Sequence, residues 1–271
     1  MTTTETNAEL TGAALSSLHK FLLYNFVLAT SPSAQAAVTL IAKSIRQCTF
    51  QASADGGDEQ GNNYEEEIVV MKLLALSSLV VRCNAGLAHL RTKEILDIFS
   101  TCVHVSKQSR ASPLLKSAAG DSLKHIVLTL CVNASDKHSR QKESRFEGDL
   151  IPLIMKEMIE LLRPTSSRSS SRSDDDRHYK DNKDNTDPLL PLTLINVALE
   201  TLGTSQQHSP AMIDLLVRGD MCKHLVLLST SRDHAVLTLT LRVIFNLFNG
   251  IKDPLKVSYH RCLSRIIFCI E

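Results

Sequence analysis

The sequence contains no tryptophan, and only 4% of its residues are aromatic although 43% are hydrophobic. Leu, Ile, Val and Ala must therefore fill the interior. Such a composition is typical of stacked helices, whose aliphatic side chains interdigitate in thin layers. Charged residues make up 22% of the chain, an ordinary fraction for a globular protein. The composition thus favours a folded helical protein.

Long apolar runs are also missing. No stretch approaches the ~18 apolar residues of a membrane-spanning helix. Residues 1–10 are polar and lack the basic and apolar regions of a secretion signal. The formal net charge of +1 creates no whole-chain attraction to nucleic acid or to an anionic membrane. The sequence therefore predicts a cytosolic protein.

Motifs for catalysis, metal binding and cofactor binding are absent. The ten histidines form no HExxH pair, and the seven cysteines form no CxxC pair. GxSxG, GxGxxG and GxxxxGK[ST] do not occur either. We therefore expect no catalytic residue, no metal and no cofactor. The cysteines, scattered and mostly within apolar runs, are expected to be buried free thiols. They are Cys48, Cys83, Cys102, Cys131, Cys222, Cys262 and Cys269.

Three histidines lie close to expected apolar helix faces. His104 and His125 neighbour apolar stripes, and we expect them to be partly buried. His224 follows Cys222 by two residues, a spacing that directs the two side chains to different faces of a helix. A buried thiol and a histidine on the polar face are the expected arrangement.

Five of the eight prolines follow Ser or Asp and indicate helix starts. Ser or Asp at the N-cap accepts a hydrogen bond from a first-turn amide, and proline at N1 has a suitable φ and no amide to leave unpaired. The five pairs are Ser31-Pro32, Ser112-Pro113, Asp187-Pro188, Ser209-Pro210 and Asp253-Pro254.

Apolar residues of helical period follow these starts and predict about ten helices, stacked as an all-α, armadillo- or HEAT-like solenoid. The expected helices cover about 10–29 and 233–249, and others begin at 32, 65, 92, 113, 149, 188, 210, 221 and 254. Surface loops are expected at 54–63 and 135–147.

Two expected apolar stripes matter below. The first helix is expected to bury Ala14, Leu15, Leu18, Leu22 and Phe26. Residues 236–243 alternate like a strand, yet a helical period over four turns favours a helix there. Its expected stripe is Leu237, Leu241, Ile244, Phe245 and Phe248.

Residues 164–187 contain no aliphatic side chain and predict a disordered linker between blocks 1–163 and 188–271. The Ser/Arg run in this segment is similar to segments that contact RNA, but Asp174, Asp175 and Asp176 offset its charge. A solvated tether is therefore favoured. Ser173, followed directly by the three aspartates, is a candidate phosphorylation site for an acidophilic kinase.

Several segments resemble the N-terminal region of the large Arf guanine-nucleotide exchange factors. Residues 10–22 (LTGAALSSLHKFL), 67–74 (EIVVMKLL) and 113–119 (PLLKSAA) resemble helices of the dimerisation and cyclophilin-binding (DCB) domain, closest to the Golgi-specific brefeldin-A-resistance-factor branch. Residues 194–202 (LINVALETL), 220–225 (DMCKHL) and 241–248 (LRVIFNLF) are similar to the homology-upstream (HUS) domain. No single motif is diagnostic, so the resemblance depends on the order of these patches.

The resemblance implies an armadillo-like regulatory region that self-associates and helps to recruit an exchange factor to Golgi membranes. Lys20 and Glu67 match the family's dimerisation lysine and glutamate, although two solvated surface charges are an equal alternative. The implied partners are a second copy, other protein subunits and small GTPases of the Arf or Rab type, without nucleic acid. The Sec-seven exchange domain is absent from the 271 residues, so we expect no enzymatic activity, in a piece incomplete at both ends.

Three alternatives remain open at this point. The chain could be a free-standing armadillo-like trafficking adaptor. It could be an enzyme whose site has no motif, although titratable groups do not cluster on one face. It could also be an RNA-associated scaffold, a reading that depends on the Ser/Arg tract alone.

Overall fold

The computed structural model describes residues 8–48, 60–109, 111–139, 150–163, 187–202 and 209–251. All regular secondary structure in these ranges is helical, which confirms the all-α solenoid prediction. The chain forms two compact units, Met1–Ile151 and Pro152–Glu271. Residues 164–186, including Ser173, lie outside the described ranges, so the linker and the phosphorylation site stay predictions.

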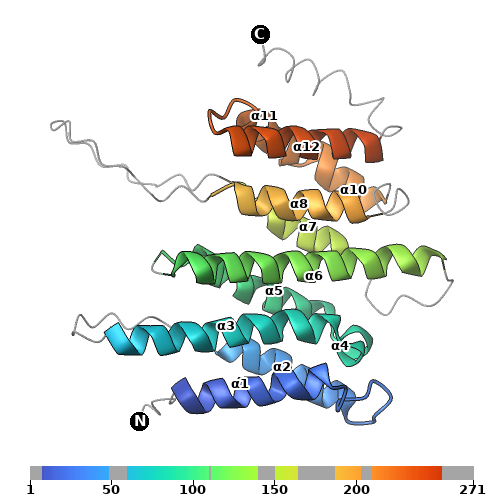
Figure 1. Cartoon of the computed structure of the whole chain (residues 1–271). Coiled ribbons are helices and arrows are strands. Elements are labelled where there is room, and N and C mark those ends of the chain that lie inside the picture. The colour runs from blue at the N-terminus through green and yellow to red at the C-terminus, as the bar shows by residue number, and fades with distance from the viewer. Residues whose placement is uncertain are drawn as a thin grey trace, which may run out of the picture. The chain divides into compact units, whose positions relative to one another are not determined.

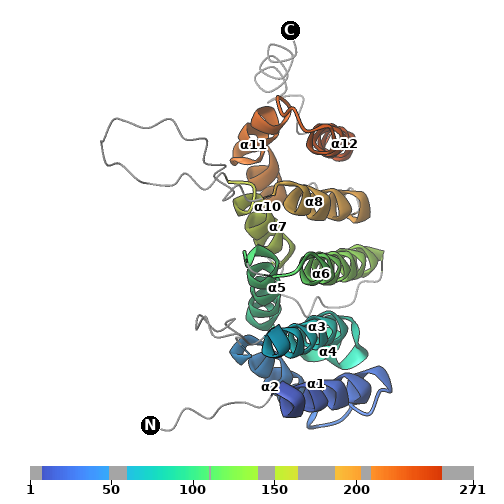
Figure 2. The same cartoon turned by 60° about the vertical axis from the view of Figure 1, so that its left-hand side comes forward.

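The first unit stacks its helices in two rows (Figure 1, Figure 2). One row holds α1 (Ala8–Leu23), α3 (Gln60–Arg82) and α6 (Pro113–Ser139), and the other holds α2 (Ala34–Gln47) and α5 (Thr92–Lys107). The short α4 (Asn84–His89) connects α3 to α5. Helices α1, α3 and α6 run in the same direction (Figure 1). This repetition of helix pairs is the architecture of armadillo and HEAT arrays.

Helix α3 is the centre of this unit because α1 and α6 both pack against it. Apolar side chains on most sides of its second half are buried. They are Val69, Val70, Leu73, Leu74, Leu76, Leu79, Val80 and Val81. A helix with apolar residues all round is stable in water only when neighbours cover it.

Side-chain caps confirm two of the five predicted Ser/Asp-Pro starts, and a third start is shifted by one residue. Ser112 Oγ accepts a hydrogen bond from Leu115 N (3.2 Å), and Ser209 Oγ accepts one from Met212 N (3.4 Å). At Asp187-Pro188 the helix begins at Leu189 with Pro188 at the N-cap, and Asp187 Oδ1 accepts a hydrogen bond from Leu189 N (3.0 Å). At Ser31-Pro32 the helix begins later, at Ala34, with Ser33 at the N-cap and no side-chain bond. The fifth pair, 253–254, lies outside the described residues.

Helix α1 ends at Leu23, six residues before the predicted end. Asn25 adopts a left-handed conformation (φ 56°), Phe26 N donates to Phe21 O (2.9 Å), and Asn25 N donates to Leu22 O (3.2 Å). This pair of bonds is the Schellman motif, which terminates helices. Phe26 was expected on the buried stripe, but it is 72% exposed and stacks edge-on against Phe21. Ala14 is exposed as well, so the predicted stripe of α1 is wrong at both positions.

Three further boundaries differ from the prediction. Helix α3 begins at Gln60, inside the expected loop 54–63, and α6 continues to Ser139, inside the expected loop 135–147. Helix α4 was not predicted at all. Cys83 Sγ caps α4 by accepting from Gly86 N (3.3 Å). A Cβ on Gly86 would collide with the backbone carbonyl oxygen of Val80, so only glycine fits at this position.

The second unit contains most of α7 (Leu150–Glu160), a helix that was predicted to belong to block 1–163. Helix α8 (Leu189–Thr201) packs against α12 (His234–Gly250), and α11 (Met221–Leu228) also contacts α12. Between α8 and α11 the chain forms α10 (Pro210–Ile213) and a π-helical turn, η1 (Asp214–Arg218). The break between 210 and 221 was predicted at Gly219-Asp220 and is confirmed.

Helix α12 includes the alternating residues 236–243, which could also have formed a strand. Its buried face is not the predicted one. Val236, Thr240, Val243 and Leu247 are buried. Phe245 is 67% exposed. The run is apolar on two faces of a helix, and periodicity alone does not show which face meets α8.

Candidate interaction surfaces

Helix α1 carries a second apolar face that no described helix covers. Leu10, Ala13, Ala14, Ser17 and Phe21 are all exposed and follow a spacing of three and four residues. Leu10 is 72% exposed and Phe21 is 51% exposed. The Ser17 hydroxyl donates to Ala13 O (3.0 Å), so its polarity is satisfied within the helix. We call these five residues the α1 stripe.

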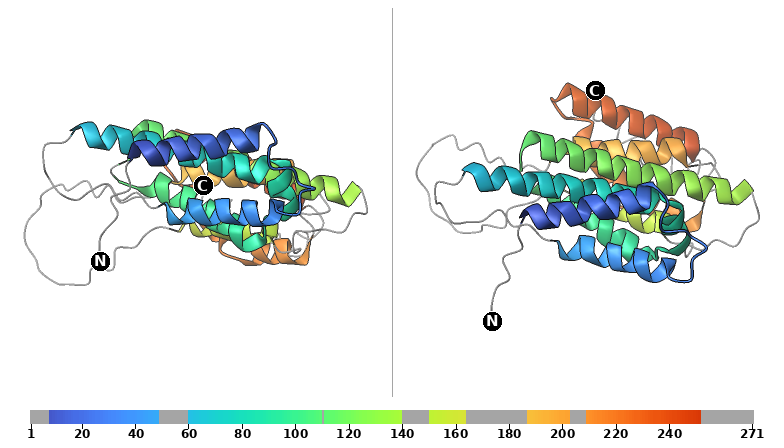
Figure 3. Two further views of the ribbon diagram at one scale, coloured as in Figure 1. Left: turned by 90° about the horizontal axis from the view of Figure 1, so that it is seen from below. Right: turned by 60° about the horizontal axis from the view of Figure 1, so that its bottom comes forward.

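The α1 stripe lies opposite the face of α1 that packs on α3. Gly12 and Leu15 are buried on that inner face. Lys72 Nζ donates to Gly12 O (3.3 Å). Helices α1 and α2 therefore form one end of the first unit, seen from below in Figure 3. Small residues lie at the centre of the α1 stripe and large ones at its ends, a pattern that allows another helix to approach closely.

Lys20 and Glu67, the two residues matched to the family's dimerisation pair, do not meet within one copy. Gly12 adjoins Val69 and Lys72. Lys20 lies eight residues, about 12 Å, beyond Gly12 toward the end of α1, whereas Glu67 precedes Val69 on the parallel helix α3. Any contact between Lys20 and Glu67 would therefore have to join two copies, and their role in dimerisation stays a prediction.

Glu67 has a structural role in the chain. Its carboxylate Oε1 accepts a hydrogen bond from Ser112 N (3.1 Å), at the start of α6. The amides at a helix N-terminus lack intrahelical acceptors, and a carboxylate there also interacts favourably with the positive end of the helix dipole.

Replacing Glu67 by Ala should therefore destabilise the first unit by about 1–2 kcal/mol, the usual cost of losing a charged acceptor at a helix start. Urea unfolding followed by circular dichroism measures the loss. Glu66→Ala, one residue earlier on α3, is the matched control. Equal stability of the two variants would show that the Glu67–Ser112 bond contributes nothing.

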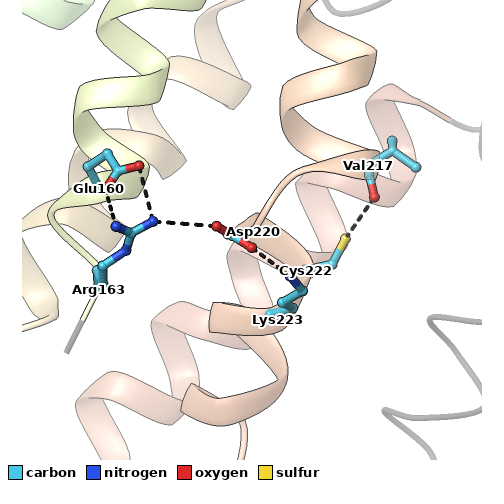
Figure 4. A network of polar contacts seen from close by, with 6 residues as sticks. All are labelled: Glu160, Arg163, Val217, Asp220, Cys222 and Lys223. Atoms are coloured by element: carbon cyan, nitrogen blue, oxygen red, sulfur yellow. Dashed lines mark hydrogen bonds and ion pairs between the residues drawn. The ribbon is translucent and has the colours of Figure 1, made fainter. Parts of the chain in front are cut away.

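An ion-pair network in the second unit joins the end of α7 to the start of α11 (Figure 4). Arg163 NH1 lies 3.3 Å from Glu160 Oε2, and Arg163 NH2 lies 3.5 Å from Asp220 Oδ2. Lys223 Nζ donates to Asp220 Oδ1 (2.7 Å). All four side chains are largely exposed, so each pair contributes little to stability by itself.

His224 lies beside this network, and its burial differs from the prediction. Its side chain is buried, at 8% exposure, whereas Cys222 is only half-buried. The prediction of a histidine on the polar face is therefore wrong, and the thiol is less buried than predicted. The other two histidines, His104 and His125, were expected to be partly buried but are exposed.

Burial lowers the pKa of His224, because a desolvated imidazole resists protonation. The carboxylates of Asp220 and Glu160 oppose this shift, and the cations of Arg163 and Lys223 add to it. The folded state thus binds its proton less readily than the unfolded state, whose pKa is about 6.5. The stability linked to His224 is present above that value and is lost as the pH falls through the folded pKa.

Amide hydrogen exchange in α11 should consequently accelerate as the pH is lowered from neutrality, after correction for intrinsic exchange rates. His224→Gln should flatten this dependence. His234→Gln, at an exposed position on α12, should leave it unchanged. The same acceleration in His224→Gln as in the wild type would assign the effect to another group.

The described cysteines are free thiols. Cys102 and Cys131 are buried as predicted, whereas Cys48, Cys83 and Cys222 are half-buried. Burial raises the pKa of Cys102 to about 12 and that of Cys131 to about 12.

A thiol with a pKa near 12 has about one molecule in 10⁴ ionised at pH 8. Native alkylation with N-ethylmaleimide should therefore modify Cys48 and leave Cys102 and Cys131 unmodified over the same time. Peptide mass spectrometry against time gives the three rates. Equal labelling of Cys48 and Cys102 in the folded chain would show that α5 opens readily.

Within the described part of the chain, no cluster of three His, Cys, Asp or Glu side chains has the arrangement of a metal site. A search of the same residues finds no helix that is long and apolar enough to cross a bilayer.

The described residues define an all-α repeat fold, in which α1 has an apolar face that no described helix covers. Residues 152–271 match the family model of the HUS domain of Mon2/Sec7/BIG1-like proteins. The match begins where the second unit begins. The second unit is therefore similar to the HUS domain of those proteins, and the match includes residues 194–248, whose sequence resembles that domain.

Curated relatives extend the similarity to the first unit. The chain is 25% identical to an uncharacterized protein of Schizosaccharomyces pombe and 20% identical to the ARF guanine-nucleotide exchange factor GNOM of Arabidopsis thaliana, over 97% of its length in both cases. It covers 18% and 22% of these relatives. The exchange factor GNL1 of Arabidopsis thaliana is 28% identical over 45% of the chain and 8% of its own length. The chain thus spans about a fifth of the first two relatives.

Proposed function

We propose that this chain is a non-catalytic regulatory and interaction region of an Arf guanine-nucleotide exchange factor, and that it self-associates and supports recruitment to Golgi membranes. The HUS match and the similarity to GNOM and GNL1 support the assignment to exchange factors. The observation that carries the self-association is the α1 stripe, an apolar helix face at the end of a stack. Uncovered faces of this kind are typical of protein interfaces.

A second copy fits the α1 stripe in an antiparallel arrangement. When two α1 helices cross near Ala14 and Ser17, the small residues of one copy face those of the other. Leu10 of each copy then packs against Phe21 of the other. An interface of this kind is self-complementary under twofold symmetry, which is the commonest symmetry of homodimers.

Charge favours the same arrangement. Glu9 lies in the first turn of α1 and Lys20 in the last turn, both on the same edge of the α1 stripe. Antiparallel pairing brings Lys20 of one copy toward Glu9 of the other, twice per dimer.

Two experiments test the proposal. Reading the transcript beyond Glu271 should reveal a Sec7-type exchange domain, and a stop codon at an intact locus would contradict the assignment to an exchange factor. A fluorescently tagged chain should co-localise with a Golgi marker in cells. A uniformly diffuse signal would contradict the recruitment role.

A further inference from the structure

The turn between α1 and α2 exposes large apolar side chains in an unusual concentration. Leu23, Tyr24, Phe26 and Leu28 are 51%, 66%, 72% and 59% exposed. We call these four residues the α1–α2 corner. In Figure 1 this turn extends past the end of α1. Between Leu22 and Ala29 the polar side-chain groups are the Tyr24 hydroxyl and the Asn25 amide alone.

The backbone amides in the first part of the corner are hydrogen-bonded to α1. Tyr24 N donates to Lys20 O (2.9 Å), and the Schellman motif engages the amides of Asn25 and Phe26. Ser31 N donates to Leu28 O (3.0 Å). His89 Nε2 lies at hydrogen-bonding distance, 2.7 Å, from Ala29 O. The amides of Tyr24, Asn25 and Phe26 can therefore enter a poorly hydrated layer without the cost of unpaired donors.

Acidic residues are absent from the surrounding sequence. No Asp or Glu occurs from Leu10 to Ala54, whereas Lys20, Lys43 and Arg46 are present. Arg46 pairs with Asp97 of α5 (3.2 Å), and Lys20 precedes the corner by one turn. An anionic surface can therefore approach the corner without repulsion from this segment, and cations near such a surface each contribute about 1 kcal/mol.

We infer that the α1–α2 corner inserts into the headgroup region of an anionic lipid bilayer. Aromatic side chains with an apolar body and a polar edge favour this layer, as Tyr24 does, and Phe26 and Leu28 would reach the acyl boundary. A protein partner fits less well, because the corner offers few groups for directional polar contacts. The inference deepens the recruitment part of the proposed function and rests on it, by naming the surface and the ligand.

Co-sedimentation of the full chain with vesicles of phosphatidylcholine and phosphatidylserine tests the inference. The double variant Phe26→Asp, Leu28→Asp should reduce the vesicle-bound to free ratio at least about tenfold, since two apolar side chains leave the membrane. Leu114→Asp, at a 64% exposed position on α6, is the matched control and should bind as the wild type does. Vesicles of phosphatidylcholine alone should bind the wild type more weakly.

Equal binding of the corner variant and the wild type would overturn the inference. The inference would also be overturned if the wild-type chain did not bind anionic vesicles, or if only a protein partner, and not vesicles, protected the corner from solvent. Light scattering on the same samples separates this from self-association. A dimer that does not bind vesicles would contradict the inference and support self-association. A monomer that binds vesicles through the corner would support the inference and contradict self-association.

Discussion

A chain carrying Leu10→Glu should be monomeric at concentrations where the wild type is a dimer. Size-exclusion chromatography with light scattering should give the wild type about twice the 29.9 kDa of one chain. The dissociation constant should rise at least about 100-fold. A twofold interface loses both copies of a leucine whose burial contributes about 1.5–3 kcal/mol each. The substitution also brings a carboxylate into an apolar contact.

The control for this experiment is Leu114→Glu. Leu114 is 64% exposed on α6 and Leu10 is 72% exposed on α1, so the two changes are alike in chemistry and in exposure. Leu114→Glu should remain a dimer. Dissociation by both variants would point to a general effect of added charge. A dimeric Leu10→Glu chain would exclude the α1 stripe as the interface.

Phe99→Ala should destabilise the first unit by about 3–5 kcal/mol, the usual cost of truncating a buried aromatic ring. Phe99 is 1% exposed on α5 and is among the largest fully buried side chains. The lost ring leaves a cavity that close-packed helices fill only in part. The urea midpoint, followed by far-ultraviolet circular dichroism, should fall accordingly.

Phe26→Ala is the comparison within the same unit. Phe26 is 72% exposed and contacts Phe21 edge-on at a centroid distance of 5.9 Å. Its truncation should cost less than about 1.5 kcal/mol. A Phe99→Ala chain that unfolds at the wild-type urea concentration would show that the first unit does not depend on the packing of α5.

Local chemistry made the helix starts predictable. Ser112 and Ser209 act as caps in the way their position before proline indicates, because capping depends on neighbouring backbone amides alone. The stripes of α2, α5 and α6 were also predictable. Each of these helices buries one face, so its apolar residues identify that face.

Where a segment is apolar on two faces, the sequence leaves the choice of face to tertiary contacts. Leu241 and Phe245 were expected inside, yet α12 turns Val243 and Leu247 toward the interior. The inner face of α1 is set by contact with α3 in the same way. The second face was visible in the sequence as Leu10, Ala14 and Phe21 at helical spacing, but nothing in the spacing separates core from interface.

Two features could not be predicted because they depend on atoms brought together by folding. Cys83 caps α4 through sulfur, a role that cysteine seldom has, and Gly86 is required by the nearby carbonyl of Val80. Burial of His224 follows from the position of α11 in the second unit, which its own helix pattern does not reveal. The α1 stripe was likewise identified only when α3 was seen on the opposite side.

Carbodiimide cross-linking tests the antiparallel α1 pairing most directly. Glu9 and Lys20 are eleven residues apart on one helix, about 16 Å, which is beyond the reach of a zero-length link between a carboxylate and an amine. Mixing isotope-labelled and unlabelled chains should therefore yield a Glu9–Lys20 peptide that joins the two populations. A dimer in which Lys20 links to no acidic residue of α1 in the other copy would contradict the pairing.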